Sequence, residues 1–418
     1  MIFLKFFYNI FLHFYKLGVF ITALWSKKAT LWLQGRKNWE KKLQTFSLKN
    51  EDIVWIHCSS LGEFEQAIPV IKSIKKEFLL YKIVVSFFSP SGFEVHKNNP
   101  IIDLVCYLPL DSKKNASLFL EIIKPKLILF IKYEFWFYYL HEARKRNIPV
   151  LLVSGIFRNN QPFFKWYGNF HKEILKCFNH FFLQNENSSK LLQSIGFNNQ
   201  EIIGDTRFER VIEIANSGNE IDGIKDFIGN NFCIVAGSTW KSDDKILSKF
   251  LNKNPDVKCI IAPHNIDAKS IEECLRIYNN SILLSESENL DSSKYQIIII
   301  NKIGLLSTLY KYANVCFVGG GFDKYNGVHN TTEAAVYSKP IIFGPYYIKY
   351  KEAVDLIELK GALTTNSQTE FEKILTDFFQ NKDFIIKTGN IAGNYVKHSV
   401  GATQKVIDYI QINRLLTN

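Results

Sequence analysis

The chain has 418 residues, more than a single hydrophobic core usually accommodates, so we expect two domains. Hydrophobic residues make up 47% and charged residues 22% of the chain, which excludes an intrinsically disordered protein. The net charge of +11 favours an anionic partner: nucleic acid, an anionic membrane surface or a phosphorylated substrate. The seven cysteines have no zinc-site or redox spacing, so we expect reduced thiols.

Residues 1–25 are strongly apolar and predict a helix. The polar residues Lys5, Asn9, His13 and Lys16 are spaced by 4, 4 and 3 positions, so they share one face of that helix. A narrow polar stripe on an apolar cylinder favours a helix that lies at a membrane surface. Two alternatives stay open: a spanning helix, for which ~20 apolar residues suffice, and an aromatic helix buried in the protein.

A basic segment with several tryptophans follows this helix, and the first acidic residue of the chain is Glu40. Cations beside tryptophans are typical of a segment that contacts anionic headgroups on the cytoplasmic face of a membrane. The residues that we expect to make this contact are Lys27, Lys28, Arg36 and Lys37.

The first half of the chain alternates apolar runs with helical patterns, which predicts a parallel sheet covered by helices on both faces. The predicted strands are residues 53–58, 82–88, 101–108, 126–131 and 149–154. Ligands of such sheets bind beyond the carboxyl ends of the strands. The polar residues that fall there are Ser59, Ser60, Glu63, Ser89, Ser91, Glu134 and Arg158.

Glu63 follows Gly62 in the first turn of a predicted helix. A carboxylate there complements the helix dipole, a role worth ~0.3–1 kcal/mol. At the mouth of a crevice the same carboxylate is also suited to act as a general base toward a hydroxyl. Both roles stay open for Glu63, and for Glu134, which we expect at the start of a helix after the fourth strand. Glu65 points to another side of the helix and does not pair with Glu63.

The second half repeats the strand–helix alternation after a polar stretch at residues 216–219. The predicted strands are residues 232–236, 257–262, 282–284, 296–300, 314–318 and 339–343, and residues 401–415 predict a closing helix. Loops at Gly237, Gly304 and Gly319 are expected to converge on one crevice that faces the first domain. Gly237 to Thr239 is expected to form a turn into the next helix.

A glycine-rich stretch runs from Gly319 to Tyr337. It follows a predicted strand and leads into a predicted helix with Asn330 as N-cap and Glu333 three positions later. A strand, a glycine loop and a helix N-terminus together form an anion site, because free backbone N–H groups point outward. The alternative is a plain capping box formed by Asn330 and Glu333. The neighbouring His329 favours a phosphosugar or nucleotide site.

In order and spacing, several short motifs along nearly the whole chain resemble the 3-deoxy-D-manno-octulosonate (Kdo) transferases. These enzymes are glycosyltransferases of the GT-B class, and they prime lipopolysaccharide synthesis. The motifs are Gly35-Arg36-Lys37, Ser59-Ser-Leu-Gly-Glu63, Tyr133-Glu-Phe-Trp136, Gly204-Asp-Thr-Arg-Phe208, Gly237-Ser-Thr239, Ile303-Gly304, His329-Asn-Thr-Thr-Glu333 and Phe343-Gly-Pro345. The resemblance implies an α/β protein with two facing Rossmann-like domains and a membrane-associated N-terminal helix. The implied parts are residues 1–45 (membrane segment), 46–208 (acceptor domain), 209–400 (CMP-sugar domain) and 401–418 (C-terminal helix).

The resemblance also implies an inverting, metal-independent transfer of Kdo from CMP-Kdo to a hydroxyl of a lipid A precursor. Glu63 is then the general base, while Glu134 and Arg207 stabilise the transition state. Ser59 and Ser60 lie on the acceptor side. No metal ligands and no cofactor are expected. The implied location is the cytoplasmic face of the bacterial inner membrane, with attachment through the N-terminal helix.

The implied donor site lies on the second domain. The phosphate would meet Ser238 and Thr239 as well as Pro263, His264 and Asn265. Ile303, Gly304 and Leu305 would line the cytidine pocket. The ribose and phosphate would be held by His329, Asn330, Thr331, Thr332 and Glu333.

Two other functions compete with this one. The same fold serves transferases and epimerases that use a UDP-sugar, and a non-catalytic membrane-bound α/β module would share the basic N-terminal segment. A nucleotide-dependent dehydrogenase is disfavoured because no G-x-G-x-x-G motif follows a predicted strand. Nucleic acid is not an expected partner, because the basic residues concentrate near the apolar terminus.

Overall fold

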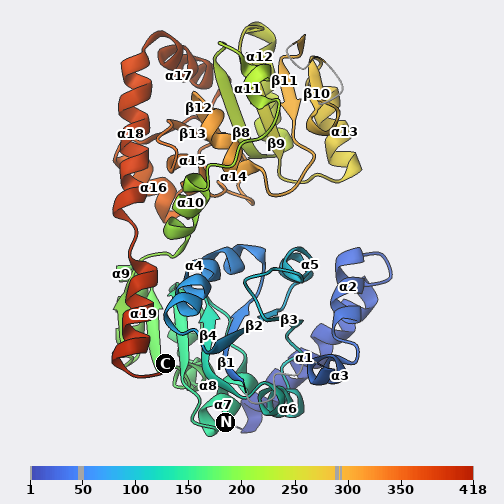
Figure 1. Cartoon of the computed structure of the whole chain (residues 1–418), viewed down its shortest axis with the longest axis vertical. Helices are drawn as coiled ribbons and strands as arrows, with labels where there is room; N and C mark the ends of the chain where they lie inside the picture. The colour runs from blue at the N-terminus through green and yellow to red at the C-terminus, as the bar shows by residue number, and fades with distance from the viewer. Residues whose placement is uncertain (1, 46–50, 288–290, 292–293, 418) are drawn as a thin grey trace. The chain divides into compact units, whose positions relative to one another are not determined.

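The computed structural model describes residues 2–45, 51–287, 291 and 294–417 (Figure 1). The chain divides into two compact units. Unit 1 comprises the chain up to Arg210 together with Val400 to the C-terminus, and unit 2 comprises Val211–Ser399. This division falls two residues after the boundary expected at 208. The closing helix, α19 (Ala402–Ile412), belongs to unit 1 and packs against α4 (Leu61–Glu77).

Unit 1 contains a parallel sheet of seven strands in the order β3-β2-β1-β4-β5-β6-β7. The strands are β1 (Asp52–Cys58), β2 (Tyr81–Phe87), β3 (Leu104–Tyr107), β4 (Pro125–Ile131), β5 (Val150–Gly155), β6 (His180–Leu183) and β7 (Gln200–Ile202). The five predicted strands are confirmed. The strands β6 and β7 were not predicted; β7, with the sequence Gln-Glu-Ile, has no apolar run that would indicate a strand.

Helices cover both faces of this sheet, and each face has its own apolar core. Because side chains alternate along a strand, Trp55 of β1 packs on one face and Ile56 on the other. The first core includes α6 and α7, and the second includes α4 and α19. The helices after β1 are α4, α5 (Pro90–His96), α6 (Lys113–Ile123), α7 (Phe137–Lys145), α8 (Asn169–Leu175), α9 (Glu186–Gln193) and α10 (Arg207–Asn216).

The N-terminal segment forms three helices: α1 (Ile2–Thr22), α2 (Lys27–Gly35) and α3 (Trp39–Thr45). Helix α1 packs on unit 1 through Tyr8, Leu12 and Tyr15, which recur at helical spacing. The Tyr8 hydroxyl donates to Asp111 Oδ2 at 2.6 Å. The first half of the predicted polar stripe also faces the protein, since Asn9 Oδ1 accepts from the Tyr138 hydroxyl at 2.8 Å.

The opposite side of α1 exposes a row of large apolar side chains. These are Leu4, Phe6, Phe7, Phe11, Phe14, Leu17, Phe20 and Ile21, followed beyond the helix by Leu24 and Trp25. The alternative of a fully buried aromatic helix is therefore wrong. Among the described residues, no helix combines the length and hydropathy that a bilayer crossing requires.

Unit 2 contains a second parallel sheet of seven strands in the order β10-β11-β9-β8-β12-β13-β14. The strands are β8 (Cys233–Thr239), β9 (Lys258–Pro263), β10 (Ser281–Leu283), β11 (Ile297–Ile299), β12 (Val315–Val318), β13 (Ile341–Phe343) and β14 (Ala362–Thr364). The helices of this unit are α11 (Ile224–Ile228), α12 (Lys241–Lys253), α13 (Ala268–Ile277), α14 (Leu306–Leu309), α15 (Thr332–Ala335), α16 (Lys351–Glu358), α17 (Gln368–Gln380) and α18 (Lys382–His398). Six of the strands were predicted, and β14 was missed. The predicted α/β fold with two Rossmann-like halves is confirmed.

Both sheets have a point at which the strand order reverses. In unit 1 the chain moves outward from β1 through β2 to β3 and then returns to β4 on the other side of β1. In unit 2 the same reversal separates β8 from β12. Loops that leave neighbouring strands at such a point diverge and open a crevice at the carboxyl ends of the strands. The predicted site residues Glu63 and Glu134 and the Gly319 loop follow β1, β4 and β12, and Ser238 lies at the end of β8.

Candidate functional site

An acidic centre lies at the reversal point of unit 1. Glu63 is in the first turn of α4, directly after β1, and its side chain is 5% exposed. The Ser59 N–H donates to Glu63 Oε2. Glu134 lies in the turn between β4 and α7, not at the start of a helix as predicted, because α7 begins only at Phe137. The two carboxylates therefore come from adjacent strands.

The environment of Glu63 favours its neutral form more than water does. Burial raises the pKa of Glu63 to about 7, and the negative charge of Glu134 adds to the rise. Backbone N–H groups of Ser59 and Ser60 and the charge of Lys132 act in the opposite direction. A carboxyl group with a pKa near 7 is suited to accept a proton at neutral pH.

Glu65 is separate from this pair, as predicted. Its Oε2 accepts from Arg210 Nε at 2.7 Å, and its Oε1 lies 3.9 Å from His96 Nε2. Glu65 is therefore part of a surface ion pair, while Glu63 points into the sheet end.

The charges of two arginines also act on Tyr133, the residue that precedes Glu134 in the chain. Burial raises the pKa of the Tyr133 hydroxyl, the charges of Glu63 and Glu134 raise it further, and those of Arg158 and Arg207 lower it. The predicted residues Glu63, Glu134 and Arg207 thus act on one phenol. Charges of both signs therefore act on this position, which suits a reaction that develops charge of both signs.

Arg207 is held in place by the buried Asp205. Its Nε donates to Asp205 Oδ2 at 2.8 Å, and Gln66 Nε2 donates to Asp205 Oδ1 at 2.9 Å. Burial would raise the pKa of Asp205, but the charge and hydrogen bonds of Arg207 lower it overall. Asp205 is therefore an ionised anchor that orients the guanidinium group.

Sequence reasoning gave no role to Tyr133 or His57, and it placed Arg158 only at the sheet edge. In the structure, the backbone next to Tyr133 is unusual: Lys132, just before it, has φ of 71° in the left-handed region, which a non-glycine residue seldom adopts. His57 contacts this centre through residues far away in sequence, which a single chain pattern does not reveal.

The second predicted site is built on the glycine loop of unit 2. A Cβ added to Gly319 would lie 2.7 Å from Thr239 Cα, and one added to Gly321 would lie 2.6 Å from Gly344 N. A Cβ added to Gly237 would lie 2.5 Å from Leu306 Cδ1. The chain at Gly237 therefore lies against the start of α14, and the loop at Gly319 lies against the end of β8, with no room for a side chain at either glycine.

Gly237, Ser238 and Thr239 differ from the prediction of a turn into a helix. They form the end of β8, where Ser238 has φ of 54° and the pairing with β9 shifts register. The irregular strand end turns the chain toward Trp240, the N-cap of α12. Asp243 of α12 stabilises this turn, since its Oδ2 accepts from Trp240 N and from Gly320 N at 2.8 Å each.

Three rings stack above this loop. The ring centroids of His264 are 4.5 Å from those of both Trp240 and His329. Trp240 Nε1 donates to His329 Nε2 at 2.9 Å. Burial and the charge of His264 lower the pKa of His329 to about 4, and burial also lowers the pKa of His264. Both imidazoles are therefore neutral at pH 7 and offer N–H donors rather than positive charge.

The predicted helix after the glycine loop is shorter than expected. Helix α15 contains only Thr332–Ala335, and Thr331, not Asn330, is its N-cap. Asn330 Oδ1 still accepts from Thr332 N at 3.2 Å, and its Nδ2 donates to Glu333 Oε1 at 2.8 Å. A single turn has little dipole, so the expected anion site on a helix N-terminus is not supported. The alternative, a capping box with Asn330 as N-cap, is wrong as well, because the Asn330 side chain accepts from Thr332 N and Thr331 is the N-cap.

The remaining predicted donor residues differ in exposure. Thr239, Thr331 and Thr332 are buried, Ile303 is exposed, and Gly304 has φ of 87°. Pro263 ends β9, and His264 and Asn265 follow it on the surface. Leu305 leads directly into α14.

The predicted membrane residues also divide into two groups. Lys27, Lys28 and Lys37 are exposed. The guanidinium group of Arg36, in contrast, donates to the carbonyl oxygens of Phe88 and Leu108 at 2.8 Å each and lies 3.8 Å from the Trp32 ring. Arg36 therefore fastens α2 to the sheet end rather than reaching toward an anionic headgroup.

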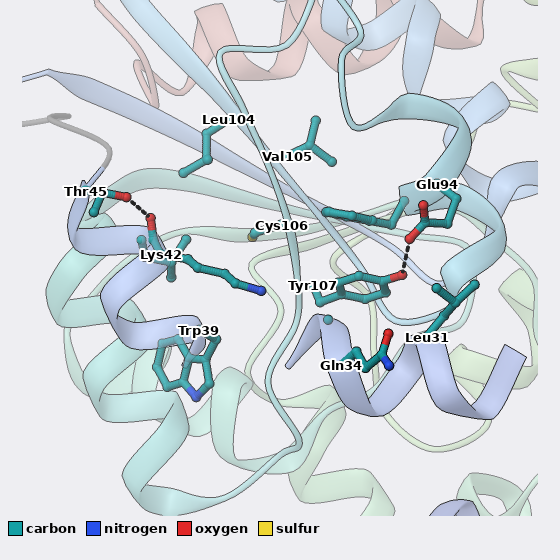
Figure 2. Close-up of a pocket in the computed structure, with 13 residues that line it drawn as sticks. Leu31, Gln34, Trp39, Lys42, Thr45, Glu94, Leu104, Val105, Cys106 and Tyr107 are labelled. Atoms are coloured by element: carbon teal, nitrogen blue, oxygen red, sulfur yellow. Dashed lines mark hydrogen bonds between the residues drawn. The ribbon is translucent and has the colours of Figure 1, made fainter. Parts of the chain in front are cut away.

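A separate hollow of about 420 Å³ lies at the edge strand β3, between α2, α3 and α5 (Figure 2). The Tyr107 hydroxyl donates to Glu94 Oε1 at 3.3 Å on its rim. The hollow contains none of the predicted site residues. Among the described residues, no group of three or more histidine, cysteine or acidic side chains is arranged to hold a metal ion.

Known proteins are similar to this chain in fold and in sequence. A glycosyltransferase from Rickettsia africae superposes with a TM-score of 0.56 at 14% identity, covering 88% of this chain and 100% of that one. A UDP-N-acetylglucosamine 2-epimerase superposes with a TM-score of 0.60 at 12% identity, covering 87% and 97%. These likenesses concern the fold alone, which is of the predicted GT-B class.

The sequence relatives are more specific. A bifunctional glycosyltransferase/methyltransferase of Fusobacterium nucleatum is 29% identical over 81% of this chain, and the chain spans 55% of its length. The 3-deoxy-D-manno-octulosonic acid transferase of Aquifex aeolicus is 27% identical over 84% of this chain and 94% of its own length. That of Haemophilus influenzae is 24% identical over 86% of both chains. Residues 37–210 match the family model of 3-deoxy-D-manno-octulosonic-acid transferases (kdotransferases). Over most of its length the chain is thus similar to the 3-deoxy-D-manno-octulosonic acid transferases, which are glycosyltransferases.

Proposed function

We propose that this protein transfers Kdo from CMP-Kdo to a hydroxyl group of a lipid A precursor, with inversion at the anomeric carbon and without a metal ion. The observation that carries this proposal is the environment of Glu63. Its carboxyl group is buried, its pKa is raised to about 7, and it lies at the strand reversal, where the charge of Glu134 acts on it and the charges of Arg158 and Arg207 act on Tyr133. These are the properties of a general base that works on a neutral hydroxyl.

In the proposed reaction, Glu63 takes the proton of the acceptor hydroxyl as its oxygen bonds to the anomeric carbon of Kdo. The bond between that carbon and the phosphate oxygen of CMP breaks, and both of its electrons leave with CMP. Positive charge develops on the sugar ring, as in other glycosyl transfers. The carboxylate of Glu134 stabilises this charge, and the guanidinium groups of Arg158 and Arg207 offset the negative charge of the sugar acid and the leaving phosphate.

The CMP moiety is assigned to unit 2. The loops after β8 and β12 approach each other so closely that no side chain fits between Gly319 and Thr239. Gly319 N and Gly320 N donate to Gly237 O and Asp243 Oδ2, so the phosphate would be bound by other groups of these loops. The neutral His264 and His329 contribute N–H donors, and Glu333, already held by Asn330, is suited to accept from ribose hydroxyls.

The acceptor is assigned to unit 1 because the apolar helix α1 lies next to the acidic centre. Tyr15 of α1 contacts Phe88, whose ring lies 4.7 Å from Trp136. Burial raises the pKa of Tyr15, the charge of Arg36 lowers it, and that of Glu134 raises it. We therefore propose that α1 lies on the cytoplasmic face of the inner membrane and brings lipid-borne hydroxyl groups close to Glu63.

Charge and exposure support this placement. The outward side of α1 presents apolar side chains, including Phe11 at 60% and Phe14 at 68% exposure. Exposed lysines follow at Lys27 and Lys28. An apolar helix face flanked by cations is typical of a helix that binds an anionic lipid surface.

The decisive experiment incubates the full chain with CMP-Kdo and a tetra-acylated lipid A precursor, and reads the products by mass spectrometry. The expected product carries at least one added Kdo, in the presence of a chelator as well as in its absence. Parallel reactions with UDP-sugars test the alternative donor class. Turnover of a UDP-sugar without turnover of CMP-Kdo would refute the proposal.

A further inference from the structure

His57 connects the core of unit 1 to its acidic centre. The residue lies on β1, and its side chain is fully buried. Its Nδ1 lies 2.8 Å from Ser86 Oγ and 3.1 Å from the Ser86 carbonyl oxygen. Its Nε2 lies 3.1 Å from Trp136 Nε1 and 3.4 Å from Glu134 Oε2. One edge of the ring therefore faces the sheet, and the other faces the acidic centre.

The partners determine which nitrogen of His57 carries the proton. An indole N–H can only donate, so Nε2 must accept the hydrogen bond from Trp136. The proton of the neutral ring is then on Nδ1, where it is donated to Ser86. Ser86 Oγ in turn accepts from Trp55 Nε1 at 2.8 Å. Ser86 Oγ thus accepts from both Trp55 and His57, and His57 in turn accepts from Trp136, so that every bond of the network has a donor and an acceptor.

The position of Glu134 follows from this arrangement. Its Oε2 lies near the Nε2 atom of a ring that cannot rotate, because both ring nitrogens are engaged. Trp136 is two residues after Glu134 and caps α7, so the bond from its indole to His57 also fixes the backbone of the turn that carries Glu134. The charged group that faces the ring is Glu134. Ser86, Phe130 and Trp136 contact the ring from other elements, Trp55 lies beside it on β1, and none of these four side chains carries a charge.

We infer that His57 is a positioning residue for the glycosyl transfer: its Nε2 accepts from Trp136 and so holds the turn that carries Glu134 in the geometry that the reaction needs. Nδ1 bonds to Ser86 in the core, and Nε2 bonds to Trp136 beside the acidic centre. This inference rests on the proposed function for the role of Glu134, but the hydrogen-bond network stands by itself.

Two substitutions test the roles of the two ring nitrogens of His57 separately. The side chain of His57→Asn keeps a polar group near the Nδ1 position and loses the Nε2 position. His57→Gln reaches the Nε2 position, where its amide can accept from Trp136. A positioning role through Nε2 predicts that His57→Asn lowers kcat at least about 10-fold with little change in the KM for the donor, and that His57→Gln recovers most of this loss.

Each variant is compared with its own thermal unfolding, so that lost activity is not confused with lost folding. If both variants lose activity equally and in proportion to their lower Tm, the role is structural and the inference is wrong. Trp136→Phe removes only the indole N–H from the site side and is expected to lower kcat as His57→Asn does. Trp55→Phe removes the matching N–H from the core side and is expected to leave kcat within about 2-fold of the wild type.

A spectroscopic measurement needs no activity. In the protein labelled with ¹⁵N-histidine, the resonance that disappears in His57→Gln is assigned to His57. We expect its Nε2 shift to be that of an unprotonated nitrogen, and a protonated Nε2 would overturn the inference. If wild-type protein fails to use CMP-Kdo while this signature is present, the proposed function fails and the network stands.

Discussion

The charge of Glu134 acts on Glu63 from the next strand of the same sheet. β1 and β4 are direct neighbours, and the two carboxylates follow their carboxyl ends. Burial is the main cause of the raised pKa of Glu63, and Glu134 is the second. One carboxylate thus prepares the other to take up a proton, which is a common way to build a base for neutral pH.

Replacing Glu63 tests its role directly. Glu63→Gln keeps the shape of the side chain and its hydrogen bond from Ser59 N, but it cannot take a proton. We expect kcat to fall at least about 10²-fold with little change in the KM for the donor. Glu65→Gln is the matched control on the same helix, because Glu65 pairs with Arg210 outside the centre. A Glu63→Gln enzyme that keeps wild-type turnover would exclude Glu63 as the base.

The pH dependence of kcat/KM is expected to report the same group. With a pKa of about 7, Glu63 is protonated below neutrality, so activity should rise as pH increases through about 7. Glu134→Gln removes a negative charge that raises this pKa. Its acid limb should therefore move to lower pH, even though its maximal rate falls. A limb that stays in place, or moves to higher pH, would contradict the coupling of the two carboxylates.

Stability should change in the opposite sense to activity. Because the folded-state pKa of Glu63 lies above its usual value of 4.5, the site favours the protonated form. Its contribution to folding is fully present below about pH 4.5 and is lost as pH rises through about 7. Glu63→Gln cannot ionise, so at pH 8 it should be more stable than the wild type, by an amount on the order of 3 kcal/mol at most. At pH 4 the two should unfold at similar temperatures, as calorimetry can show.

Much of this architecture was predictable because apolar runs and turn residues alternate so regularly along the chain. β1, β4, β8 and β12 are continuous buried runs, and the polar residues after them lie at the reversal points as expected. The edge strands β7 (Gln-Glu-Ile) and β14 (Ala-Leu-Thr) were missed because neither contains a run of large apolar residues. They form because a neighbouring strand offers unpaired backbone groups, which is a tertiary effect.

The sequence indicated which residues belong to the site better than it indicated the contacts that those residues make. His57 and Trp136 are 79 positions apart, so their bond depends on the pairing of β1 with β4. Arg36 was expected at the membrane because it follows two lysines, yet three carbonyl groups and the Trp32 ring hold it inside. A local pattern shows that a residue is charged, but not which distant backbone carbonyl groups accept its hydrogen bonds.

The glycine loop gives a test of donor binding. Gly319→Ala would place a methyl group 2.7 Å from Thr239 Cα, closer than backbone atoms allow, so the loops after β8 and β12 must separate. We expect the KM for the donor to rise at least about 10-fold while vesicle binding is unchanged. Gly18→Ala is the control, because a Cβ at Gly18 meets nothing within 4 Å. Equal donor KM values in Gly319→Ala and wild type would remove this loop from the donor site.

The exposed face of α1 can be tested separately from catalysis. Phe7, Phe11, Phe14 and Ile21 point away from unit 1, and burying each in lipid is worth on the order of 1–3 kcal/mol. Replacing all four with serine should abolish flotation with vesicles that contain anionic lipid, while turnover of a detergent-dispersed acceptor persists. Tyr325→Ser, which changes a side chain that is 94% exposed in unit 2, should float like the wild type.

The helix can keep its place on the protein in the fourfold variant, because Tyr8, Leu12 and Tyr15 are untouched. Undiminished flotation would show that another surface binds the lipid. Loss of turnover in detergent would mean that this face also contributes to the reaction itself.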